Sequence, residues 1–170
     1  MATGTRRGMI IVGVDGSAAS VEALRQAQRL ALPLGASVEA WGCWDFPAGF
    51  AAYDAMGVDG FAHTVAEGLH NAMAEAFGRQ QPRNVNTKLV HGSPRPALIE
   101  ASKHASLLVV GRRGHGGFRE LLLGSVTTAC VAHAHCPVLV VPAPGPTVNP
   151  QPRPAHASAA APKSRIPEGA

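Results

Sequence analysis

The chain has 170 residues, a length that fits one domain with a two-sided core. Its formal net charge is +4, but residues 8–142 are neutral as a group, so the excess positive charge lies in the terminal segments. A neutral domain lacks the basic surface of a nucleic-acid binder, and no apolar run approaches ~20 residues. Composition therefore argues against nucleic acid as a partner and against a membrane span.

The chain also lacks the marks of secretion and of cysteine-bound metal. Arg6 and Arg7 precede a short apolar stretch with no small-residue cleavage site, so we expect no signal peptide. The three cysteines are odd in number and lack C-x-x-C spacing, which argues against disulfides and a zinc site. We therefore expect a cytoplasmic protein.

Strand-like and helix-like segments alternate along the chain. Met9–Val14 is a continuous apolar run typical of a central parallel strand, and Asp15-Gly16-Ser17 follows it with helix N-cap chemistry. Residues 18–32 favour a helix that Pro33 and Gly35 close. The other expected elements are a strand at 37–44, a loop at 45–60, a helix at 61–77, a strand at 85–90, a helix at 94–104, a strand at 107–110, a helix at 124–134 and a strand at 138–141. This alternation predicts a mostly parallel sheet with helices on both faces.

The fourth predicted strand leads into a glycine-rich loop and then a helix start. Gly111 ends the strand, four glycines follow at 114, 116, 117 and 124, and Ser125 opens the helix. Glycines let backbone N–H groups approach a ligand, and a helix start offers unpaired N–H groups at the positive end of the dipole. Together these features predict a phosphate site, with a loop that binds nothing as the alternative.

Two common phosphate motifs do not fit this stretch. A P-loop needs a Gly-Lys pair, which the chain lacks, and a dinucleotide fingerprint begun at Gly114 would need glycine where Arg119 stands. The residues instead spell G-x2-G-x9-G-[ST], formed by Gly111, Gly114, Gly124 and Ser125. This spacing resembles the ATP-binding motif of the universal stress protein family.

The resemblance extends over residues 9–142, with an apolar first strand that ends at Asp15, a Gly-x-Pro turn at 92–94 and a final strand after Cys136-Pro137. It implies a three-layer α/β open sandwich, Rossmann-like and of the adenine nucleotide alpha hydrolase-like group, with five parallel strands in the order 3-2-1-4-5. Ligands of such sheets bind at the carboxyl ends of the strands beside the topological switch. Asp15 and the glycine loop should meet there, and the resemblance implies ATP and Mg²⁺ between them.

The resemblance assigns nucleotide contacts to four segments. The residues are Gly13, Val14, Asp15, Ala40, Trp41, Val110, Gly111, Arg113, Gly114, Gly124, Ser125, Val126 and Thr127. Asp15 should contact ribose or Mg²⁺, with a helix N-cap as its alternative role. Residues 124–127 should hold phosphates through N–H and hydroxyl groups, and the end of the second strand should lie against adenine, where the family has small aliphatic residues and this chain has Trp41. Arg112, Arg113 and His115 either meet phosphate or face water.

No catalytic residue is expected. The motif stretch has no lysine, and its only carboxylate, Glu120, has no evident partner. We therefore favour an ATP-binding regulatory module of the stress response over a slow ATP hydrolase, a cAMP-binding module or a nucleotide-free interaction module. His133, His135 and Cys136 have a spacing that suits a metal site poorly, so Mg²⁺ at Asp15 is the expected metal contact.

The last predicted strand indicates how the protein could form an oligomer. The last strand, Val138–Val141, would be an exposed apolar edge, and the resemblance implies a homodimer that pairs it across a two-fold axis. Residues 143–170 are rich in Pro and Ala and poor in apolar bulk, and we expect them, like residues 1–8, to be disordered. No protein partner can be named from the sequence.

Overall fold

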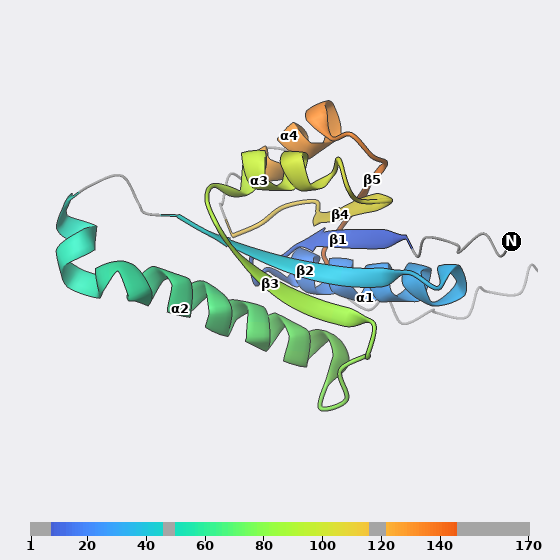
Figure 1. Cartoon of the computed structure of the whole chain (residues 1–170), viewed down its shortest axis with the longest axis horizontal. Helices are drawn as coiled ribbons and strands as arrows, with labels where there is room; N and C mark the ends of the chain where they lie inside the picture. The colour runs from blue at the N-terminus through green and yellow to red at the C-terminus, as the bar shows by residue number, and fades with distance from the viewer. Residues whose placement is uncertain (1–7, 46–49, 116–121, 146–170) are drawn as a thin grey trace, which may run out of the picture.

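The computed structural model describes residues 8–45, 50–115 and 122–145, and at 50–59 it describes the helical backbone alone. Strands and helices alternate strictly along the described chain (Figure 1). The elements are β1 (Met9–Gly13), α1 (Ala18–Leu34), β2 (Ser37–Trp44), α2 (Phe50–Phe77), β3 (Val85–His91), α3 (Pro94–Ala101), β4 (Leu107–Gly111), α4 (Ser125–His133) and β5 (Val138–Val141).

The strands form one parallel sheet in the order β3-β2-β1-β4-β5, which confirms the predicted fold. Helices α1 and α2 cover one face, and α3 and α4 cover the other (Figure 1). Gly13 at the end of β1 pairs with Trp41 on β2 and with Val110 on β4. The carboxyl ends of these three strands therefore lie level at one edge of the sheet.

The central strands are buried on both faces, as their continuous apolar sequence requires. In β1, Ile10 and Val12 join the core under α1 and α2, while Ile11 joins the core under α3 and α4. These side chains are at most 1% exposed, and full burial of such a side chain contributes about 1.5–3 kcal/mol. The two cores fix β1 beside β4 and so hold the two halves of the predicted site together.

The first helix ends later than the sequence predicted. Pro33 lies inside α1, and Gly35 is the residue that ends it, with φ 59° and an N–H that donates to the Leu32 carbonyl at 3.2 Å. Proline has no N–H to donate to the Arg29 carbonyl, so it costs the helix one hydrogen bond, and α1 continues past it only to Leu34. The left-handed conformation favours glycine, so Gly35 keeps its predicted role as the helix stop.

The second helix contradicts the predicted loop at 45–60. Its 28 residues begin at Phe50 and include Gly57 and Gly60, which had indicated a loop. A helix tolerates such glycines at a cost of about 1 kcal/mol each, and the packing of the later turns of α2 on β2, where Val65 and Leu69 lie over Gly42, outweighs this cost. Figure 1 shows that α2 extends beyond the carboxyl edge of the sheet.

Smaller differences lie at other element ends. The third helix stops at Ala101 instead of His104, and β3 runs one residue further, to His91. None of the described helices has the length and hydropathy needed to cross a membrane. The predicted disorder of residues 1–8 and 143–170 falls almost wholly outside the described residues and stays a prediction.

Candidate functional site

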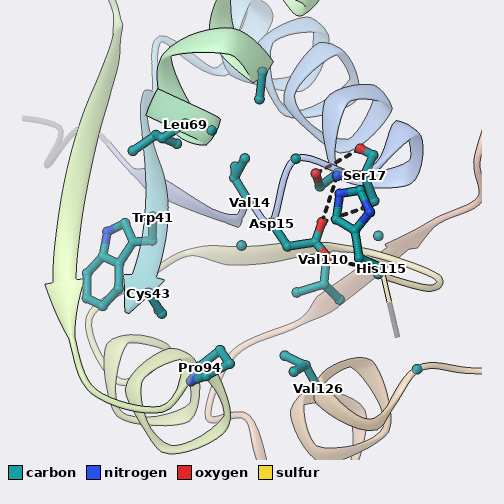
Figure 2. Close-up of a pocket in the computed structure, with 18 of the residues that line it drawn as sticks. Val14, Asp15, Ser17, Trp41, Cys43, Leu69, Pro94, Val110, His115 and Val126 are labelled. Carbon is teal, nitrogen blue, oxygen red and sulfur yellow. Dashed lines mark hydrogen bonds between the residues drawn. The ribbon is translucent and has the colours of Figure 1, made fainter. Parts of the chain in front are cut away.

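A cleft of about 640 Å³ opens at the carboxyl ends of β1, β2 and β4 (Figure 2). This is the topological switch of the sheet, and the volume lies within the usual range for small-molecule sites. The predicted site residues that line the cleft are Gly13, Val14, Asp15, Trp41, Val110, Gly111, Arg113, Gly114, Gly124, Ser125, Val126 and Thr127. Ala40 does not line it, because its side chain points into the core under α1 and α2 and is fully buried.

Asp15 ties the turn after β1 to the glycine loop. Its Oδ1 accepts hydrogen bonds from the Ser17 N–H at 3.0 Å and from the Ser17 hydroxyl at 2.6 Å, and its Oδ2 accepts one from the His115 N–H at 3.2 Å. The helix N-cap is Ser17, whose hydroxyl accepts from the Ser20 N–H at 3.3 Å, so the alternative N-cap role for Asp15 is wrong. A carboxylate has about four acceptor positions, so roughly one remains for a ligand.

The first two motif glycines are required by packing. A Cβ on Gly111 would lie 2.9 Å from the Ala19 Cβ and 3.0 Å from the Ser20 nitrogen, both on α1. A Cβ on Gly114 would collide with the Asp15 carboxylate. Neither glycine has positive φ, so the backbone freedom that the sequence suggested is not used at these positions. Their small size lets the loop lie directly against α1 and Asp15.

The start of α4 offers backbone donors to the cleft. The Thr128 N–H makes the first helical hydrogen bond, to the Gly124 carbonyl at 2.9 Å, so the N–H groups of residues 125–127 precede the helical ladder. The Ser125 side chain is exposed. The Thr127 hydroxyl, by contrast, is buried and donates to the Gly111 carbonyl at 2.7 Å, so it cannot donate to a phosphate as predicted.

Two of the three predicted cationic side chains line the cleft. Arg113 lines it, and its buried Nε has no hydrogen-bond partner among the described residues. An unpaired buried donor of this kind costs about 1–3 kcal/mol, and a bound anion would remove that cost. His115 also lines the cleft. Arg112 is exposed and does not line it, and its backbone N–H donates to the Val141 carbonyl at 2.6 Å.

The other end of the cleft is apolar. Trp41 and Cys43 of β2 and Pro94 of α3 line it on the side away from Asp15 in Figure 2, and Leu98 of α3 also lines the cleft. The Trp41 indole is held by its N–H bond to the Glu39 carboxylate at 3.0 Å and by the Lys88 ammonium, 4.4 Å from the ring centroid. It is therefore a fixed, half-buried aromatic wall.

The thiol in the cleft is not a nucleophile at neutral pH. Burial, with a smaller contribution from the neighbouring Cys130 thiol, raises the pKa of Cys43 to about 11. The thiolate is the reactive form, so Cys43 acts as an apolar surface. The described residues also contain no set of three His, Cys, Asp or Glu side chains able to hold a metal ion, and Glu120 lies outside the described residues.

Sequence reasoning missed the contribution of α2. Seven residues of this helix line the cleft, and they are Thr64, Val65, Gly68, Leu69, Asn71, Ala72 and Glu75. Their spacing follows one side of a helix, and this periodicity was visible in the sequence. The sequence does not indicate which face of the sheet α2 covers, and this position decides that the side of α2 formed by these residues lies over the cleft.

The fold and the cleft define a parallel α/β protein with a ligand site at its topological switch. Residues 7–142 match the model of the universal stress protein family, and the chain belongs to that family. Universal stress protein Rv2623 of Mycobacterium tuberculosis strain H37Rv is 34% identical over 149 residues, which cover 82% of this chain and 49% of that protein. The chain thus spans about half the length of that relative.

Solved structures of universal stress proteins are also similar to the chain. Universal stress protein UspA from Lactobacillus plantarum is 25% identical, with a TM-score of 0.66 over 81% of this chain and 99% of that chain. A universal stress protein solved in complex with cAMP is 26% identical, with a TM-score of 0.51 over 79% of this chain and 95% of that chain.

Proposed function

We propose that the protein is a regulatory module that binds an adenine nucleotide, with ATP as the expected ligand, in this cleft. The observation that carries the proposal is that one cavity joins a helix start suited to phosphate with an apolar end suited to a base. The universal stress protein relative solved with cAMP supports an adenine nucleotide as the ligand class. Occupancy of the site would change the surface that a protein partner meets in the stress response.

Each part of the nucleotide has a complementary group. The N–H groups at 125–127, the exposed Ser125 hydroxyl and the unpaired Arg113 Nε would receive phosphate oxygens. Trp41 would lie against the base. Mg²⁺ commonly binds one or two carboxylates together with phosphate oxygens, and the free acceptor position of Asp15 fits that role. The ion would neutralise phosphate charge beside the Asp15 carboxylate.

Two of the candidate catalytic groups in the cleft are poorly suited to catalysis. Asp15 is committed to three hydrogen bonds, and the Cys43 thiol is protonated, so neither is a free base or nucleophile, which leaves Glu75 and His115 as the other candidate bases. Binding without rapid hydrolysis therefore fits the residues better than turnover as the main task. A steady-state assay with ATP and Mg²⁺ tests this point, and many turnovers per minute would favour the hydrolase alternative.

The binding test uses calorimetric titration of ATP with Mg²⁺ into the full chain after bound nucleotide has been removed. Ser125→Glu places a negative charge at the first residue of α4, where it favours the helix and repels phosphate. We expect saturable binding by the unsubstituted protein and at least a tenfold loss in Ser125→Glu. Ser125→Gln is the matched control, because it has the same size without the charge. Absence of binding by the unsubstituted protein would refute the proposal.

We also infer a homodimer through β5. Among the described residues this strand pairs with β4 alone and its outer edge has no partner strand, and Val138, Leu139 and Val140 are only partly buried. Such an apolar edge is usually covered or paired. Antiparallel pairing with a second copy would satisfy both its backbone and its side chains. Light scattering at micromolar concentration tests this inference, and a monomer there would contradict it.

A further inference from the structure

The wall that α2 supplies to the cleft has a glycine at its centre. Thr64, Gly68, Asn71 and Glu75 recur at helical spacing and all line the cleft. Apart from Gly68 itself, its two chain neighbours and the adjacent backbone of α2, no atom of the described residues lies within 4 Å of the place where a Gly68 Cβ would stand, and its φ is not positive. Glycine weakens a helix relative to alanine. Neither backbone conformation nor a packed neighbour therefore explains why glycine occupies this position.

Gly42, in contrast to Gly68, is a glycine whose missing side chain makes room for α2 to pack on the sheet. A Cβ on Gly42 of β2 would lie 3.0 Å from the Val65 Cγ1 and 3.3 Å from the Leu69 Cδ2. The space that Gly42 leaves is therefore filled by two side chains of α2, which lies directly on the strand. Gly42 is explained by packing, whereas the space at Gly68 stays open to the cleft.

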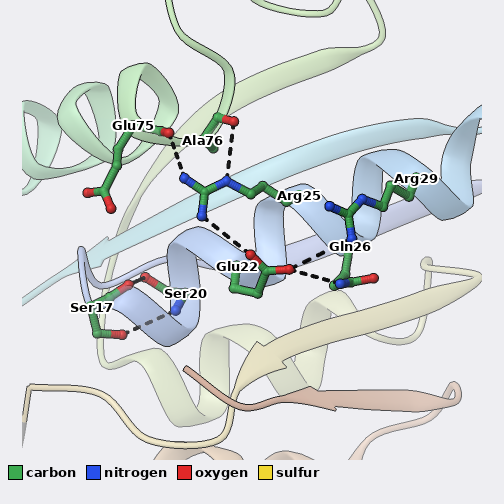
Figure 3. Close-up of polar contacts among 8 residues, drawn as sticks. All are labelled: Ser17, Ser20, Glu22, Arg25, Gln26, Arg29, Glu75 and Ala76. Carbon is green, nitrogen blue, oxygen red and sulfur yellow. Dashed lines mark hydrogen bonds and ion pairs between the residues drawn. The ribbon is translucent and has the colours of Figure 1, made fainter. Parts of the chain in front are cut away.

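Arg25 of α1 holds the other end of this wall. Its guanidinium donates from Nη2 to the Glu75 carbonyl at 2.7 Å and from Nε to the Ala76 carbonyl at 3.4 Å, and it pairs with the Glu22 carboxylate at 3.3 Å (Figure 3). Carbonyls in the last turn of a helix lack helical partners, so this contact caps α2. The α2 helix is thus held against β2 at Gly42 and against α1 by Arg25. Because its position is fixed, the side chain at position 68 sets the local width of the cleft.

The groups around Gly68 indicate which part of a ligand fits there. Asn71 and Glu75 present an exposed amide and carboxylate, and Asp15 adds a second carboxylate to the same cleft. The Arg25 guanidinium is turned to the α2 carbonyls and Glu22. The Glu75 carboxylate disfavours phosphate at this wall, and together with the Asn71 amide it favours a neutral group with hydroxyl donors. In a nucleotide, that group is the sugar.

We propose that Gly68 is a specificity-determining residue, whose missing side chain leaves room for the sugar of the bound nucleotide. The proposal rests on the nucleotide-binding function proposed above. It divides the ligand between two walls, with phosphates at the start of α4 and the sugar against α2. A side chain at position 68 would then exclude nucleosides and their phosphates while leaving the phosphate end of the cleft unchanged.

The test compares Gly68→Ala, Gly68→Leu and the control Ala74→Leu. Ala74 is exposed on α2 and does not line the cleft, so it receives the same isobutyl group away from the ligand. Calorimetry measures binding of ATP and of inorganic tripolyphosphate, and thermal unfolding is followed for every variant. We expect Gly68→Leu to weaken ATP at least tenfold and tripolyphosphate less than twofold. Ala74→Leu should change ATP binding less than twofold.

Both Gly68 variants should unfold at a higher temperature than the unsubstituted protein, because alanine and leucine favour helices. Unchanged ATP affinity in Gly68→Leu would overturn the proposal. An equal loss of tripolyphosphate, or a lower unfolding temperature, would also overturn it, because either result would show a distorted site instead of lost room. Failure of the unsubstituted protein to bind ATP would instead refute the proposed function, so the two failures are distinguishable.

Discussion

Thr127→Val tests the contact that joins the start of α4 to the end of β4. The substitution keeps the shape of the side chain but removes the hydroxyl that donates to the Gly111 carbonyl at 2.7 Å. Thr127 is 3% exposed, whereas Gly111 is half-buried and lines the cleft, so water replaces the lost donor only in part. Leaving a buried polar group without its partner costs about 1–3 kcal/mol, and we expect a loss of about 2 kcal/mol in the free energy of unfolding.

Urea unfolding measures this loss. With an m-value of about 2 kcal/mol/M, the midpoint should fall by about 1 M at constant m. Thr128→Val is the matched control, because the Thr128 hydroxyl also donates to a backbone carbonyl, that of Gly124 at 2.9 Å, but is exposed. Its loss should stay within about 0.5 kcal/mol. Equal midpoints for the two variants would refute the claim that the Thr127 bond secures the site.

Two further predictions follow from contacts in the cleft. Gly111→Ala should lower the free energy of unfolding by about 1–3 kcal/mol in urea because of its clash with α1, whereas Gly124→Ala, with its nearest neighbour at 3.5 Å, should lose less than about 1 kcal/mol. The raised pKa of Cys43, about 11 against 9.0 for an ordinary thiol, favours the folded state fully below pH 9 and progressively less as pH rises towards 11. Urea unfolding between pH 8 and 11 should therefore show a steeper loss in the unsubstituted protein than in Cys43→Ala, and parallel profiles would contradict the burial of this thiol.

Much of the architecture follows from local signals in the sequence. Apolar runs such as 9–14 and 107–110 located the central strands, because strands buried on both faces need continuous apolar sequence. Gly35 ended α1 as predicted, because a left-handed residue favours glycine. The meeting of Asp15 with the glycine loop depended on strand order, which the family resemblance supplied and the sheet confirms.

The errors arose where tertiary packing overrides local preference. Gly57 and Gly60 indicated a loop, yet they lie within α2, whose later turns pack on β2 through Gly42. The family resemblance likewise placed Ala40 in the site beside Trp41, although neighbouring residues of a strand point to opposite faces. Which of the two faces the cleft uses depends on the helices packed against the sheet, and no local pattern in β2 contains that information.

The glycine motif and the ligand site are physically separable. Gly111 would be needed even in a protein that bound nothing, since a side chain there would strike the backbone of α1, and a side chain at Gly114 would displace the Asp15 carboxylate. Their presence indicates how the loop is packed and carries little information about a ligand. Stronger support for a ligand comes from the buried Arg113 Nε, which has no hydrogen-bond partner in the described part of the chain, and from the open space beside Gly68. A relative could therefore keep the glycine motif yet lose nucleotide binding through changes at these two positions, and such a protein would still fold.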